Sequence, residues 1–131
     1  MSKTASALKI KDRSGAPLRK ATATEVVSQL AQVQGWQLRG DGADVNIHKS
    51  FAFADYYETI AFVNAVALVA HRMDHHPDLG VHFNRCDVQL STHDVGGLSQ
   101  ADFEVAALID ALLACCLLYT SPSPRDKRQS R

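Results

Sequence analysis

The side chains best suited to chemistry in this sequence are histidines, and five of the six lie within residues 71–93. Imidazole is the side chain that exchanges protons near neutral pH. Four aspartates lie among or beside these histidines, and imidazoles with carboxylates at the end of a helix and a strand can form an acid–base site. The residues are His71, His75, His76, His82 and His93, with Asp74, Asp78, Asp87 and Asp94.

The segment Asp74-His75-His76-Pro77 predicts two imidazoles at a helix end. Pro77 disfavours helix at the residue before it, so adjacent side chains there need not diverge by the roughly 100° of a helix interior. Two charged rings in one pocket would repel, so at least one stays neutral at pH 7, giving a proton donor beside an acceptor. The alternative is two solvated histidines that the helix dipole favours.

A zinc site is a weaker interpretation of the same residues. His71 and His75 are four apart and share a helix face, a spacing that can bind zinc. The motif HExxH would need a glutamate where Arg72 stands, and strand alternation puts Cys86 and His93 on opposite faces. We therefore expect no metal site.

Ser99-Gln-Ala-Asp102 has two interpretations, which sequence leaves open. As a capping box, Ser99 begins a helix and Asp102 returns the hydrogen bond. As part of a site, Asp102 orients a histidine. Phosphate-binding glycine loops and a nucleophile elbow are absent, so covalent catalysis has little support.

Three helices are expected to position these residues. A capping box at Thr22-Ala-Thr-Glu25 and apolar residues at helical spacing predict a helix over about 23–34. A second helix starts at Asp55, carries a wide apolar arc and ends near His75. A third starts at 99–102 and continues to about 113.

Three strands complete the expected elements: a short one at 36–38, one at 45–53, and a strand region from 81 to 92. Residues alternate along 45–53, with Lys49 as an exception on the apolar face or a residue at the sheet's rim. The predicted class is α+β, an antiparallel sheet with helices packed on one face, in the order α-β-β-α-β-α.

The 131 residues suffice for one domain, which we place at 21–118. Residues 1–20 form a basic extension, expected as a short strand or a loose arm. The Ser/Pro/Arg-rich stretch 119–131 is expected to be disordered, and is either a native basic tail or vector-derived.

Charge and hydropathy exclude several function classes. The domain carries twelve acidic against four basic side chains, the wrong sign for direct binding of nucleic acid. The longest nearly apolar run, 60–70, is too short to span a membrane, and residues 1–10 lack the apolar core of a signal peptide. Three cysteines, two of them adjacent, give no disulfide framework, so we expect a reducing, cytoplasmic setting.

Three motifs in order resemble the signature of the pterin-4a-carbinolamine dehydratases: Asp74-His-His-Pro-Asp78, Ser91-Thr-His-Asp94 and Gly97-Leu-Ser-Gln-Ala-Asp102. Gly35-Trp36 and the aromatic strand end 51–53 agree, and the resemblance covers about residues 17–114. It implies dehydration of 4a-hydroxytetrahydropterin to quinonoid dihydropterin, which recycles the cofactor of aromatic amino-acid hydroxylases. It implies no metal and no organic cofactor in the protein itself. Leu79, Asp78, Asp94 and His71 depart from the common pattern, which affects contacts at the pterin edge.

The resemblance also implies site residues and partners. The catalytic set would be His75, His76 and His93 with Asp102 in support. Pterin-binding residues would be Asp74, His75, His76, Ser91, Thr92, His93 and Asp94. Members of this family form homodimers or homotetramers, and some act as dimerisation partners of a transcription factor. An acid–base dehydratase is the first hypothesis, and a non-catalytic oligomeric partner of a hydroxylase or transcription factor is the second.

Overall fold

The computed structural model describes residues 10–120, with side chains to residue 114. Its helices are α2 (Ala23–Leu30), α3 (Tyr56–Met73) and α4 (Gln100–Thr120), and its strands are β1 (Gln37–Arg39), β2 (Asn46–Ala52), β3 (Asp78–Val81) and β4 (Arg85–Leu90). Two short 3₁₀ turns lie at Gly42–Asp44 and His93–Val95. Residues 1–9 of the predicted extension 1–20 and residues 121–131 of the predicted tail 119–131 lie outside the described residues. Residues 119 and 120 were predicted to be disordered, but they are the last two residues of α4.

The four strands form one antiparallel sheet in the order β1-β2-β4-β3. The α+β class is confirmed, but the predicted element order lacks a strand, because the single strand region expected after α3 is the hairpin β3–β4. The missed strand β3 is four residues long, contains Gly80 and begins directly after Pro77, so its pattern is too short to identify. The observed order is α-β-β-α-β-β-α.

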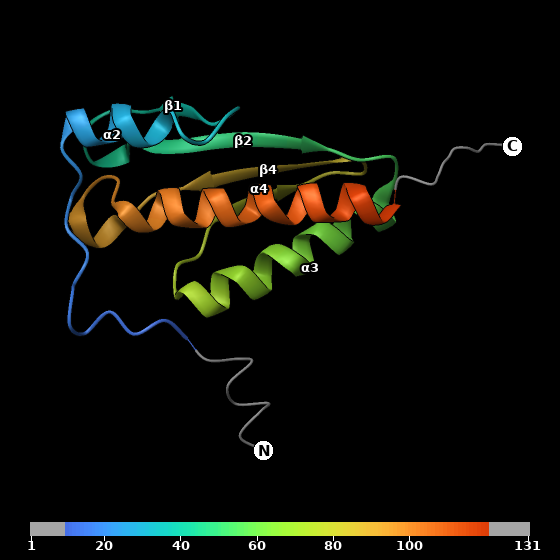
Figure 1. Ribbon diagram of the computed structural model, residues 1–131. Coiled ribbons are helices and arrows are strands. Elements are labelled where there is room, and N and C mark those ends of the chain that lie inside the picture. The colour runs from blue at the N-terminus through green and yellow to red at the C-terminus, as the bar shows by residue number, and fades with distance from the viewer. Residues whose placement is uncertain (1–9, 121–131) are drawn as a thin grey trace, which may run out of the picture.

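Alternation along β2 and β4 separates a buried face of the sheet from an open one. Ile47, Phe51, Cys86, Val88 and Leu90 are buried and belong to the main hydrophobic cluster. Figure 1 shows α3 and α4 beneath this face of the sheet, with the opposite face uncovered. The expectation of helices on one face is therefore confirmed. Among the described residues, no helix is long and apolar enough to cross a membrane.

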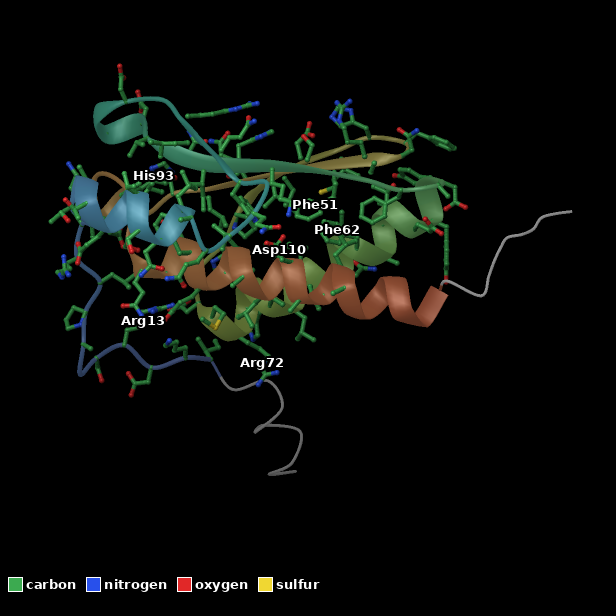
Figure 2. The ribbon with its side chains drawn as sticks, turned by 45° about the horizontal axis from the view of Figure 1, so that its top comes forward. Arg13, Phe51, Phe62, Arg72, His93 and Asp110 are labelled. Atoms are coloured by element: carbon green, nitrogen blue, oxygen red, sulfur yellow. The ribbon has the colours of Figure 1, made fainter. Side chains whose placement is uncertain are left out.

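Lys49, the exception in the strand pattern, points into the helix layer. Its ammonium donates to Asp110 Oδ1 of α4 and to the carbonyl of Gln34, both at 2.9 Å. Trp36 Nε1 donates to the other carboxylate oxygen of Asp110 at 3.1 Å. The charge on the apolar face is thus paired, and the pair ties β2 to α4, where Figure 2 labels Asp110, and to the turn before β1.

The helix α2 ends four residues earlier than predicted. Gln32 and Val33 donate to carbonyls three residues back, at Gln29 and Leu30, so the chain leaves the helix through tight turns. Gly35 then takes a φ of +85°, the left-handed conformation that glycine adopts without strain. A glycine was expected at this stop, but the turns of residues 31–34 separate it from the helix itself.

Candidate active site

The last turn of α3 sets the direction of the two adjacent histidines. Asp74 has a φ of +51°, the one non-glycine residue with positive φ in the described chain. The amide of Asp74 donates to the carbonyl of His71, and the amide of His75 donates to the carbonyl of Ala70 at 3.1 Å. These two hydrogen bonds are the pair that defines a Schellman motif at a helix C-terminus. Aspartate tolerates this conformation better than most residues. The helix therefore stops at Met73, and the reversal turns His75 back towards the protein.

His75 and Asp102 form a buried pair that joins α3 to α4. The imidazole Nε2 lies 2.6 Å from Asp102 Oδ1. Asp102 is fully buried and His75 is 9 % exposed. An isolated carboxylate in such a place would be costly, so it needs donors on every side.

Thr92 and Ser99 supply the remaining donors to Asp102. The Thr92 hydroxyl donates to Oδ2 at 2.7 Å, and the backbone amide of Ser99 donates to the same oxygen at 3.0 Å. Because the Thr92 proton is used there, the Ser99 hydroxyl must donate to Thr92 Oγ1, 2.7 Å away. The carboxylate accepts the Ser99 amide, which is one half of the expected capping box, but the Ser99 hydroxyl accepts from the amide of Ala101 and not from that of Asp102. The same carboxylate also binds the imidazole of His75.

The orientation of His75 follows from this carboxylate. An ionised carboxylate only accepts hydrogen bonds, so Nε2 of His75 carries a proton and donates it to Asp102. In the neutral ring the proton-free nitrogen is then Nδ1. A ring nitrogen left free while a carboxylate holds the other is the arrangement of a general base.

The other predicted site residues lie at the same end of the sheet. Asp78 of β3 pairs with Gln89 of β4, so the chain just before β3 and the chain just after β4 leave the sheet side by side. His76 is two residues before Asp78, and Ser91 is two residues after Gln89. Thr92, which bonds Asp102 directly, precedes His93, and Figure 2 shows His93 at this end of the sheet, near α2.

The predicted substrate-binding side chains differ from the His75–Asp102 pair in exposure. Asp74, His76, His93 and Asp94 are exposed and Ser91 is half-buried. Within residues 10–120, none of these side chains has a hydrogen-bond or ion-pair partner. Thr92 is buried inside the network. The structure therefore combines the His75 imidazole, fixed by Asp102, with the exposed imidazoles of His76 and His93 on neighbouring segments of the chain.

Other titratable residues from the sequence lie outside this group. Asp87 is on the open face of the sheet, where the Ser50 hydroxyl, together with Arg85, lowers its pKa, and His82 lies 3.4 Å from it. Burial raises the pKa of the Cys86 thiol to about 11, which makes it a poor nucleophile. In the described part of the chain, no three His, Cys, Asp or Glu residues are grouped so that they could hold a metal ion.

Comparison with known proteins gives the same family as the sequence motifs. The family model described as pterin 4 alpha carbinolamine dehydratase matches residues 19–112. A protein of Paracidovorax citrulli (strain AAC00-1), provisionally named a pterin-4-alpha-carbinolamine dehydratase, is 59% identical over 104 residues, covering 79% of this chain and 90% of that protein.

Two solved structures are also similar. A transcriptional coactivator/pterin dehydratase from Brucella melitensis has a TM-score of 0.67 and 32% identity, covering 72% of this chain and 98% of that one. A pterin dehydratase-like protein described as a RuBisCO assembly factor in the alpha-carboxysome has a TM-score of 0.51 and 28% identity, covering 60% and 89%. The first of these names pairs a dehydratase with a coactivator, and the second names an assembly role.

Proposed function

The chain belongs to the pterin-4a-carbinolamine dehydratase family, and on that premise we propose that it converts 4a-hydroxytetrahydropterin to quinonoid dihydropterin and water. The observation that carries the proposal is the buried His75–Asp102 pair, fixed by Thr92 and Ser99, at the protein end where His76 and His93 are exposed. This activity would recycle the cofactor of aromatic amino-acid hydroxylases in the cytoplasm.

The reaction needs one base and one acid. Hydroxide is a poor leaving group, so an acid must protonate the 4a-oxygen as the C4a–O bond breaks. A base removes the N5 proton, and the electrons of the N5–H bond form the C4a=N5 bond while water leaves. Positioned proton transfers of this kind each contribute about 10²–10⁴ to a rate.

The residues divide between these roles by their surroundings. Nδ1 of His75 takes the N5 proton, because Asp102 holds Nε2 and stabilises the imidazolium that forms. An exposed imidazole, His76 or His93, donates to the 4a-oxygen. Asp74, Ser91 and Asp94 offer hydrogen bonds to the polar edge of the pterin, and Thr92 acts through Asp102.

The test is a coupled assay in which the 4a-hydroxypterin is generated in situ and the spontaneous dehydration is subtracted. Of His76→Ala and His93→Ala, the variant that removes the acid should lower kcat at least tenfold. The matched control is His82→Ala, an exposed histidine beside Asp87 on the open face of the sheet. Equal activity in all three variants would refute the proposed roles.

A second candidate function is that of an oligomeric binding partner without catalysis. The two similar structures favour it, since their names include a coactivator and an assembly factor. Leu68 of α3 and Leu108 of α4 are 49% and 41% exposed, which is compatible with a homodimer or homotetramer formed through these helices. Tight binding of a hydroxylase or a transcription factor by a chain without dehydratase activity would establish this function instead.

A further inference from the structure

We propose that Arg13, on the segment before α2, is a positioning residue for the His75–Asp102 pair. Residues 10–20, here called the N-terminal arm, run from the start of α2 past the last turn of α3, as Figure 1 shows in blue. The family model matches from residue 19, so Arg13 lies outside the matched region. The inference rests on the proposed function for its catalytic readout, and a second readout is independent of activity.

The arm satisfies the last carbonyls of α3. A helix leaves its final four carbonyls without partners inside the helix. The amide of Lys11 donates to the carbonyl of Arg72 at 2.7 Å, and Arg13 Nη2 donates to the carbonyl of Met73, also at 2.7 Å. Met73 is the residue before the left-handed Asp74, so Arg13 holds the helix end from which His75 turns inward.

The same two arm residues also reach α4. Arg13 Nη1 lies 3.9 Å from Glu104 Oε1, and Lys11 Nζ donates to the same oxygen at 3.3 Å. Glu104 is two residues beyond Asp102, in the first turns of α4. Arg13 therefore bridges the helix end that presents His75 to the helix that carries Asp102. Figure 2 shows Arg13 on the arm beside these helices.

The residue that follows the arm, Ala21, is fixed to the segment just before α4. The amide of Ala21 donates to the carbonyl of Leu98 at 2.7 Å, and the next residue, Ser99, donates its amide to Asp102. Between these anchors a cavity of about 350 Å³ separates the arm from α2 and the start of α4. Hydrogen bonds and ion pairs, more than apolar packing, therefore hold the arm between Lys11 and Ala21.

Arg13 carries more of this bridge than Lys11. Its side chain is 16% exposed, against 41% for Lys11, and exposed ion pairs contribute little stability. Its Nε is buried without a partner, so the guanidinium is held there by its two terminal nitrogens alone. Loss of Arg13 leaves the Met73 carbonyl without its donor, and the end of α3 is then free to shift against Asp102.

The experiment compares the full-length chain with Arg13→Met, which keeps the length of the side chain and removes its donors. The matched control is Arg19→Met on the same arm, whose guanidinium pairs with exposed Glu25 of α2. One readout is the NMR signal of the His75 imidazole nitrogens and of the proton shared with Asp102. The other is kcat and KM in the dehydration assay.

We expect Arg13→Met to broaden or shift the His75 signals and to lower kcat about tenfold with KM within about twofold, because small displacements of reacting groups reduce rates steeply. Arg13→Lys should recover part of the loss, since it keeps a charged donor without the planar fork. Arg19→Met should change neither readout.

Unchanged His75 signals and kcat in Arg13→Met would overturn the inference. If Arg13→Met does not fold, Glu104→Met removes the acceptor at the other end of the bridge while keeping a side chain of similar length, and wild-type imidazole signals in that variant overturn it equally. A wild-type chain without dehydratase activity would refute the proposed function, while the NMR comparison would still decide the role of Arg13.

Discussion

Replacing Asp102 by asparagine should reverse the tautomer of His75 while leaving the fold in place. The Ser99 amide can only donate, so the oxygen of the new amide must remain at the position of Oδ2. The amide NH₂ group then faces Nε2 of His75, which must become the acceptor. The ring proton moves to Nδ1, and the nitrogen that should take the N5 proton no longer can.

The magnitude follows from the function lost. General base catalysis is worth about 10²–10⁴ in rate, and the equivalent Asp→Asn change in the serine-protease triad costs about 10⁴ through the same tautomer effect. We therefore expect kcat to fall at least a hundredfold. The two bonds to Oδ2 lose charge assistance, so the free energy of unfolding should fall by about 1–3 kcal/mol.

The assay is stopped-flow measurement of quinonoid dihydropterin formation, with thermal unfolding of each variant recorded beside it. Asp110→Asn is the control, because Asp110 is also on α4 and accepts from Trp36 and Lys49. It should lower stability and leave kcat within about threefold, since it touches no site residue. An Asp102→Asn variant that keeps wild-type kcat would refute the assignment of His75 as a base held by Asp102.

Three further predictions concern the elements that hold the site. Asp74→Gly should raise the free energy of unfolding, measured by urea titration, by about 1 kcal/mol, because glycine adopts a φ of +51° without strain. Asp74→Ala should lower the free energy of unfolding. Equal stabilities of the two variants would contradict this prediction. Gly35→Ala should lower the free energy of unfolding by about 1–2 kcal/mol, because alanine is strained at a φ of +85° and its Cβ would lie 3.0 Å from Lys49 Cε. An unchanged free energy of unfolding would contradict this prediction. Cys86 stays a thiol at pH 8, because it is buried and its pKa is raised to about 11. Peptide mapping after alkylation should therefore find Cys86 unlabelled in the native protein and labelled after unfolding. Rapid labelling of the native protein would contradict this prediction.

Local chemistry explains why much of the fold could be predicted from the sequence. The capping box of Thr22 and Glu25 is present with both of its bonds, and Asp55 accepts from the amide of Glu58 at the start of α3. The strand predicted at 45–53 is observed at Asn46–Ala52. Each of these signals depends on residues a few positions apart. The strand β3 was missed because it is short and defined by its pairing with β4.

The site could be predicted only in part, because its decisive contacts join distant residues. The motifs identified His75 and Asp102, but their bond spans 27 positions and the sequence could not distinguish a cap from an orienting carboxylate. The donor role of Thr92 depends on where β4 ends relative to α4. The contact of Arg13 with Met73 spans 60 positions and has no local signal. The partner of Lys49, Asp110, is 61 positions away, so the sequence showed only an exception in a strand.

The most direct test of the proposed chemistry is the rate of quinonoid dihydropterin formation as a function of protein concentration, for the wild type and for His75→Ala/His76→Ala. The wild-type rate should rise in proportion to protein concentration above the spontaneous dehydration, and the double variant should show no such rise. A double variant as active as the wild type, or a folded wild type that never exceeds the spontaneous rate, would contradict catalysis by these imidazoles.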